Sequence, residues 1–126
     1  MLTRILLAFA ALTFAPFGIW SFLDPLGMAA SLGVEVGGPN GAYEMRGIYG
    51  GVSLAAALLC ASGAILATMR RPALWFVVVY MGGYVFARAA ALLLGPPPTP
   101  AFAVFIAFET GMLLAAAAAL RWANRS

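Results

Sequence analysis

The sequence EMRGIYGG, residues 44–51, places a carboxylate, a guanidinium, a phenol and three glycines at the start of a long apolar run. Each charged side chain near the centre of a membrane span costs roughly 2.5–3.5 kcal/mol if it faces lipid, so such charges need partners. Glu44 and Arg46 are two residues apart on a helix and point to different sides, so they cannot satisfy each other. We therefore expect their partners to come from other parts of the chain.

The composition is typical of a membrane protein. Hydrophobic residues make up 64% of the 126 positions and charged residues 9%, whereas soluble domains have roughly 45–50% apolar and 25% charged residues. We expect a single all-α domain over residues 1–126, embedded in the bilayer as a four-helix bundle. The net charge of +3 does not indicate nucleic-acid binding, because the arginines outside the apolar runs lie in short connections and near the chain ends.

Four apolar runs, at about residues 5–23, 42–69, 73–94 and 99–120, are expected to span the membrane. Each is long enough for roughly 30 Å of hydrocarbon at about 1.5 Å per helical residue. Two charges and a proline at residues 70–72 end the second run, and prolines at residues 96–98 separate the third from the fourth. A secretory signal peptide is the alternative for the first run, but its length and its aromatic end favour a span.

The segment between the first two runs is expected to contain a short helix. Asp24 is a residue type that caps helix N-termini, and Pro25 suits the first helical position. We therefore predict a helix over residues 25–32 that lies in the membrane interface. Residues 35–41 are rich in glycine and contain Pro39, so they are predicted to form a turn before the second span.

The arginines outside the spans predict the orientation of the bundle. Short cytoplasmic segments carry an excess of Lys and Arg, and five arginines fall on one side of the predicted bundle whereas two acids fall on the other. We therefore predict that both termini are cytoplasmic. The arginines are Arg4, Arg70, Arg71, Arg121 and Arg125, and the acids are Asp24 and Glu35.

The four remaining charges, Glu44, Arg46, Arg88 and Glu109, sum to zero and lie within or at the edge of the predicted spans. Counting about 1.5 Å per residue from the outer ends places all four in the outer half of the bundle. Arg88 lies between the two glutamates in depth, and its long side chain reaches either of them. We predict that Arg88 pairs with Glu109, with Glu44 as a further partner, and that Arg46 completes a neutral network.

Polar and aromatic neighbours predict a pocket around these charges. Tyr84 lies one helical turn from Arg88, and Arg46, Tyr49 and Ser53 share a face of the second span. The candidate ligand-binding residues are therefore Glu44, Arg46, Tyr49, Tyr84, Arg88 and Glu109.

The fourth span adds an aromatic wall, because Phe102, Phe105, Glu109 and Met112 fall on one stripe of the helix. An apolar cavity with a few convergent polar groups is typical of a ligand site. Buried ion pairs and aromatic stripes also serve to fix the register of packed helices. The residues alone leave both interpretations, a ligand pocket and a structural fastening, open.

The glycines of the opening stretch predict close helix packing. Gly47 and Gly51 form a face of small residues that continues through Ala55, and Gly82-Gly83 of the third span is expected to supply the facing surface. A phosphate-binding loop is a much weaker interpretation, because its lysine and its strand context are missing.

Few residues are suited to catalysis or metal binding. The chain has no His and no Lys, and Cys60 stands alone in an apolar run, where a packing role is expected. Metal sites of the zinc type need several His, Cys or carboxylate ligands, so we expect no metal and no cofactor. Without an activated nucleophile, hydrolysis and group transfer are poorly supported, and the sequence favours a protein that is not an enzyme.

The motif E-x-R-G-x-Y-G-G of residues 44–51, together with Arg88 and Glu109 in later spans, resembles an uncharacterised family of small bacterial four-span membrane proteins. The similarity extends from the Asp24-Pro25 turn to the end of the chain. The resemblance implies a multi-pass four-helix bundle in the inner membrane of a bacterial cell, in which these polar positions are hallmarks. It implies no activity.

Three functions from different classes fit these observations. The first is a binding or accessory membrane protein, whose pocket opens to the outer face and holds a small amphipathic or anionic molecule beside Arg46 and Arg88. The second is a proton-coupled transporter or membrane enzyme with Glu109 as the protonatable group and Tyr84 or Tyr49 as a donor. The third is a purely structural subunit of a homo-oligomer or larger membrane complex. The lipid bilayer is the partner common to all three.

Overall fold

The structure, a computed structural model, describes residues 1–123, and its regular elements in this part of the chain are helices. Four helical segments are long and apolar enough to cross a membrane: Leu2–Leu23, Gly38–Ile65, Ala67–Leu94 and Pro100–Ala123. The expectation of an all-helical chain with four long apolar helices is therefore confirmed for the described residues. Arg125, one of the arginines used above to predict the orientation, lies outside the described residues.

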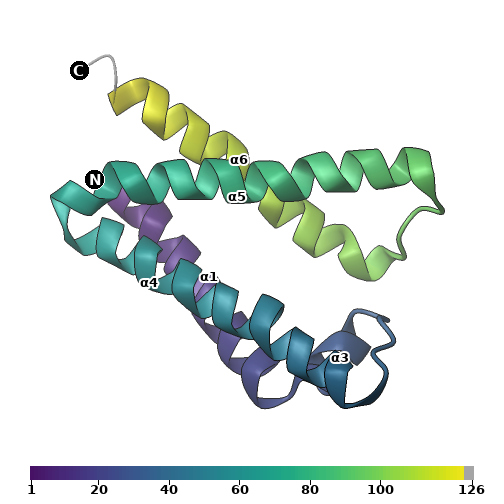
Figure 1. Cartoon of the computed structure of the whole chain (residues 1–126). Helices are drawn as coiled ribbons and strands as arrows, with labels where there is room; N and C mark the ends of the chain where they lie inside the picture. Colours follow the sequence, from purple (N-terminus) through teal and green to yellow (C-terminus); the bar gives the residue numbers. More distant parts are fainter. Residues whose placement is uncertain (124–126) are drawn as a thin grey trace.

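Two helical hairpins make up the molecule (Figure 1). In the first hairpin, α1 packs along α4, and in the second, α5 packs along α6. The start of α1, the turn from α4 to α5 and the end of α6 lie at one end, which we call the terminal end; the hairpins diverge towards the opposite end, the open end (Figure 1). The elements are α1 (Leu2–Leu23), α2 (Pro25–Ser31), α3 (Gly38–Met45), η1 (Arg46–Gly51), α4 (Val52–Ile65), α5 (Ala67–Leu94), η2 (Pro100–Phe102) and α6 (Ala103–Ala123).

The connection from α1 to α4 contains the short helix that the sequence predicts. The side chain of Asp24 accepts a hydrogen bond of 3.0 Å from the backbone N–H of Gly27 and caps α2, which has Pro25 in its first turn. The predicted turn at residues 35–41 is shorter than expected, since α3 already begins at Gly38. Pro39 sits in the first turn of α3, where its fixed φ favours a helix start and its missing N–H is not needed.

The second and third long helices meet at Leu66, earlier than the charges at residues 70–72 suggest. Leu66 is extended, and α5 begins directly after it, so that both arginines and the proline lie in the first turns of α5. Nε of Arg4 donates to the carbonyl of Ala64 at 3.0 Å, and Nε of Arg70 donates to that of Gly63 at 3.4 Å. These bonds satisfy carbonyls at the end of α4 that have no partner within the helix.

Small and aliphatic side chains fill the core at the terminal end. A Cβ on Gly63 would lie 2.6 Å from Cβ of Ala73 and 2.9 Å from Cδ1 of Leu7, so glycine is needed where α4 meets both α1 and α5. Cys60 is a free thiol and is fully buried in this core. The buried cluster comprises Leu7, Ala10, Phe14, Ala56, Ala57, Cys60, Ala73, Leu74, Val77, Met81, Met112, Ala116 and Leu120.

Residues 46–51 form a π-helix between α3 and α4. Its glycines pack differently from the prediction: a Cβ on Gly47 would meet nothing within 4 Å, and the same holds for Gly83. Gly50 instead faces α1, where a Cβ would lie 3.1–3.2 Å from the Cβ, Cα and N atoms of Phe22. The predicted packing of Gly47 and Gly51 on Gly82-Gly83 is therefore wrong. The wider π turn offsets the faces that regular α-helical spacing would align.

The two glycines of the π-helix provide a matched test of this packing. Gly50→Ala is expected to destabilise the protein by about 1–3 kcal/mol, because the new methyl group is forced against the backbone of α1. Gly47→Ala, which adds the same group in open space, is expected to change stability by no more than about 1 kcal/mol. Thermal unfolding of both variants in one detergent measures the difference, and equal losses would contradict the assigned contact.

Candidate functional site

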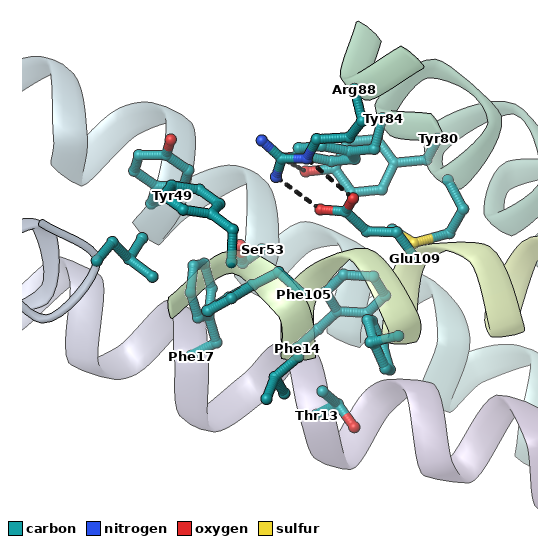
Figure 2. Close-up of a pocket in the computed structure, with 15 residues that line it drawn as sticks. Thr13, Phe14, Phe17, Tyr49, Ser53, Tyr80, Tyr84, Arg88, Phe105 and Glu109 are labelled. Atoms are coloured by element: carbon teal, nitrogen blue, oxygen red, sulfur yellow. Dashed lines mark hydrogen bonds and ion pairs between the residues drawn. The ribbon is translucent and has the colours of Figure 1, made fainter. Parts of the chain in front are cut away.

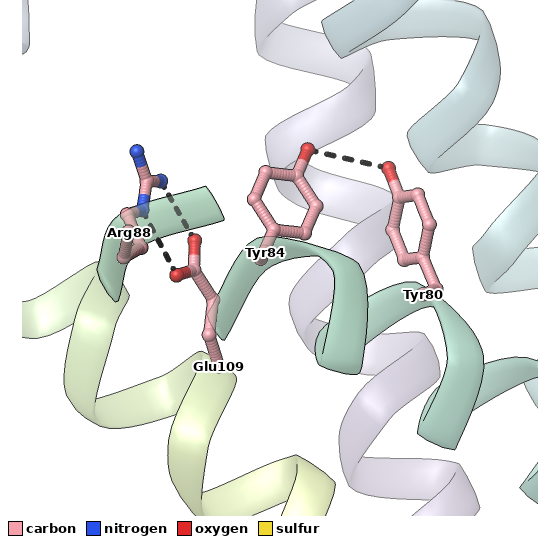
Figure 3. A network of polar contacts seen from close by, with 4 residues as sticks. All are labelled: Tyr80, Tyr84, Arg88 and Glu109. Atoms are coloured by element: carbon pink, nitrogen blue, oxygen red, sulfur yellow. Dashed lines mark hydrogen bonds and ion pairs between the residues drawn. The ribbon is translucent and has the colours of Figure 1, made fainter. Parts of the chain in front are cut away.

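The side chains of Arg88 on α5 and Glu109 on α6 form a bidentate ion pair (Figure 3). Nη2 of Arg88 donates to Oε1 of Glu109 at 2.8 Å, and Nε donates to Oε2 at 3.1 Å. The side chain of Glu109 is 6% exposed and that of Arg88 is 34% exposed. The predicted pairing of these two residues is confirmed. Parallel hydrogen bonds of this kind fix geometry as well as charge.

Aromatic rings flank the Arg88 guanidinium. Its Cζ atom lies 5.5 Å from the ring centroid of Tyr84 and 5.2 Å from that of Phe102, distances at which a cation is attracted to a ring face. Within the described residues Nη1 of Arg88 has no hydrogen-bond partner. In Figure 2 the guanidinium nitrogen without a dashed line lies on the side of Tyr49, across from Glu109. This nitrogen is therefore free to donate to another molecule.

A cavity of about 290 Å³ lies between the two hairpins, next to the ion pair (Figure 2). Its walls are mainly aromatic, and its few polar groups come from both hairpins. Ligand pockets in proteins have the same character and begin at about 300 Å³. The lining residues are Thr13, Phe14, Phe17, Leu32, Tyr49, Ser53, Tyr80, Met81, Tyr84, Arg88, Phe102, Val104, Phe105, Phe108 and Glu109.

Contacts between aromatic rings form the walls of this cavity. Phe17 of α1 packs edge-on against Tyr49 of the π-helix at 6.0 Å and against Phe105 of α6 at 5.9 Å between ring centroids. Tyr80 stands next to Tyr84, with 3.5 Å between their hydroxyl oxygens (Figure 3). The cavity therefore combines rigid apolar walls with phenol, hydroxyl and guanidinium groups.

A second hollow, of about 390 Å³, borders the ion pair and lies between α5, α6 and their proline-rich connection. Arg88, Phe102 and Glu109 line both hollows. The ion pair and one phenyl ring thus form a wall with space on either side. The pair is not enclosed by tight packing of the kind found in the core at the terminal end.

Four of the six candidate residues, Tyr49, Tyr84, Arg88 and Glu109, line the cavity. The other two, Glu44 and Arg46, do not, and the predicted four-charge network is wrong in this respect. Nε of Arg46 donates to the carbonyl of Phe22 at the end of α1, at 2.9 Å. Glu44 is exposed and has no ion-pair partner among residues 1–123. Arg46 binds there instead of at the ion pair because the last carbonyls of α1 lack partners within their own helix.

Sequence reasoning missed the contribution of α1 and part of that of α5 and α6. The cavity is also lined by Thr13, Phe14 and Phe17. The hydropathy of this apolar run predicts a membrane span, but it does not indicate which of its side chains face a cavity. Tyr80 could have been found, since it lies one helical turn from Tyr84. Met112 was expected on the aromatic wall but is buried in the core. Within residues 1–123 no group of three or more His, Cys, Asp and Glu side chains is placed to hold a metal ion.

The buried pair predicts strongly non-additive mutational effects. Arg88→Met leaves the Glu109 carboxylate without its donors, and breaking a buried pair in this way costs about 3–5 kcal/mol. Because Arg88 is partly exposed, we expect a loss of about 3 kcal/mol. The double variant Arg88→Met/Glu109→Gln removes both charges and is expected to recover most of that loss.

Arg71→Met serves as the control, since Arg71 is exposed and distant from the cavity in the sequence of α5. Its effect is expected to stay within about 0.5 kcal/mol. Unfolding in mixed micelles measures all three variants. A double variant that is no more stable than Arg88→Met would show that the pair is not coupled in the folded protein.

Comparison with curated proteins and with solved structures gives no match for this chain. A family described as a domain of unknown function (DUF4345) matches residues 2–122, which is nearly the whole chain. The expectation of an uncharacterised family is thereby confirmed. The chain belongs to the DUF4345 family.

Proposed function

We propose that this protein is a multi-pass membrane protein that binds a small amphipathic molecule in the cavity between its two hairpins. The observation that carries the proposal is the aromatic cavity of about 290 Å³ with the free Nη1 of Arg88 at its edge. The apolar part of the ligand packs among the phenyl rings. A hydrogen-bond acceptor on the ligand accepts a hydrogen bond from Nη1 of Arg88. The ligand site comprises Tyr49, Tyr84, Arg88 and Glu109.

The charge of the cavity favours a neutral ligand over an anion. Arg88 is already compensated by Glu109, and Arg46 is engaged at the end of α1. A bound carboxylate would add an uncompensated negative charge in surroundings of low dielectric, which is costly. A ketone, ester or amide oxygen accepts the same hydrogen bond without that cost. Of the two ligand types that the sequence suggests, the amphipathic one therefore fits better.

The orientation follows the positive-inside rule. Arg4, Arg70 and Arg121 lie at the terminal end of the hairpins, and short cytoplasmic segments carry such an excess of arginine. We place this end in the cytoplasm and the cavity in the outer half of a bacterial inner membrane. A ligand then reaches the cavity from the outer leaflet or from the external face.

The other two functions receive less support. A proton carrier needs a carboxylate that is accessible for proton exchange, whereas both carboxylate oxygens of Glu109 accept hydrogen bonds from Arg88 and the side chain is 6% exposed. A purely structural pair would be expected in a tightly filled interface, yet hollows border this pair on both sides. Ligand binding accounts for both the hollow and the unused donor.

Two probes of the same shape test the neutral-ligand proposal. 4′-Methylacetophenone and 4-methylbenzoate differ mainly in whether the acceptor oxygen carries charge. We expect the ketone to raise the apparent Tm of the protein more than the carboxylate does, because ligand binding stabilises the folded state. In Glu109→Gln the charge of Arg88 is uncompensated, so the preference is expected to reverse, by about tenfold in relative Kd or more.

Glu44→Gln is the matched control, since it removes the same charge from an exposed position outside the cavity. It should keep the wild-type preference for the ketone. If neither probe shifts the Tm of the wild-type protein, the cavity is not a site for this class of molecule. If Glu109→Gln keeps the order of the wild type, the charge argument is wrong.

A further inference from the structure

The hydroxyl of Ser53 lacks the hydrogen bond that several helical Ser and Thr residues of this chain make. In a helix, Ser and Thr side chains commonly donate to the carbonyl four residues earlier. Three hydroxyls in the long helices follow this pattern, at 2.8–2.9 Å. Within the described residues the Ser53 hydroxyl has no hydrogen-bond partner at all. The three regular bonds run from Thr13 to Phe9, from Ser21 to Phe17 and from Ser62 to Leu58.

The π-helix accounts for the missing bond of Ser53. The carbonyl four residues before Ser53 belongs to Tyr49, which lies within the π-helical stretch. There the hydrogen bonds skip one more residue, as in the bond from the N–H of Val52 to the carbonyl of Gly47. Residues four apart are then no longer aligned along the helix axis. The Ser53 hydroxyl consequently loses the acceptor that a regular α-helix would give it.

The position of Ser53 on the cavity wall makes the missing bond significant. Ser53 is 3% exposed and lines the cavity, and Figure 2 shows it on the wall opposite the Arg88–Glu109 pair. Among the described residues no fully buried side-chain nitrogen or oxygen atom lacks a hydrogen-bond partner. The unpartnered Ser53 hydroxyl therefore keeps some accessible surface, and Ser53 lines the cavity. A molecule in the cavity can supply the hydrogen-bond partner that the protein does not.

We infer that Ser53 is a second ligand-binding group, so that the cavity recognises molecules with two polar functions rather than one. This inference rests on the proposed function. The ligand carries an acceptor oxygen for Nη1 of Arg88 and a separate hydroxyl or carbonyl group for Ser53, on either side of an apolar body that packs among the rings. A site built to hydrogen-bond a ligand hydroxyl discriminates strongly against the analogue that lacks it.

Matched probes test the second contact. 3′- and 4′-hydroxyacetophenone carry a hydroxyl where 3′- and 4′-methylacetophenone carry a methyl group. At least one hydroxyl isomer is expected to bind the wild-type protein about tenfold more tightly than its methyl partner. Ser53→Ala is expected to abolish this preference while leaving the affinity for the methyl probes unchanged within about twofold.

Ser62→Ala is the control, because it removes an exposed hydroxyl that has its regular partner. It should keep the full preference for the hydroxyl probe. The ligand-free proteins give an independent readout: since Ser53 makes no bond, Ser53→Ala should unfold at the wild-type Tm or above it. A clear drop in the Tm of Ser53→Ala would assign the hydroxyl a structural role and overturn the inference.

The outcomes separate this inference from the function on which it rests. Equal binding of hydroxyl and methyl probes by the wild-type protein overturns the role of Ser53 but leaves a ligand cavity. Failure of all four probes to bind overturns both. If Ser53→Ala retains the preference for the hydroxyl probe, another group of the protein binds the probe's hydroxyl, and the inference is likewise overturned.

Discussion

The ion pair between Arg88 and Glu109 is the interaction on which the open half of the bundle depends. Removing two charges from water costs several kcal/mol per ion, and only good geometry with further hydrogen bonds offsets that cost. Here two parallel bonds and two aromatic rings surround the guanidinium. Packed apolar residues would hold α5 to α6 at least as well. The pair therefore provides a fixed position for Nη1, which an apolar contact cannot supply.

The two ends of the bundle are built from side chains of different size, and this difference creates the cavity. At the terminal end, Gly63 and Ala73 let the helices approach closely, and the core is filled. At the open end, Phe17 packs edge-on against Tyr49 within its own hairpin and against Phe105 of the other hairpin. Rings that meet in this way leave spaces that small aliphatic side chains would fill. The hollow is thus a consequence of where aromatic residues occur along the spans.

The sequence was sufficient to predict the four long apolar helices, the capped helix at Pro25 and the pairing of Arg88 with Glu109. These features follow from hydropathy, from local capping chemistry and from the rarity of buried charge. It was not sufficient to place Arg46, because an unpaired carbonyl at the end of another helix is invisible in a pattern of side chains. Nor could it place Gly50 against α1, because the helical period that predicts shared faces does not apply within a π-helix.

The π-helix also determines the charge of the cavity. With regular α-helical winding, Arg46, Tyr49 and Ser53 would lie on one face of the helix. The extra residue in the π turn separates them: Tyr49 and Ser53 line the cavity, whereas Arg46 binds the carbonyl of Phe22 outside it. The cavity thereby gains hydroxyl groups but no second positive charge. The charge balance on which the proposed preference for a neutral ligand rests is thus a consequence of backbone winding as much as of side-chain chemistry.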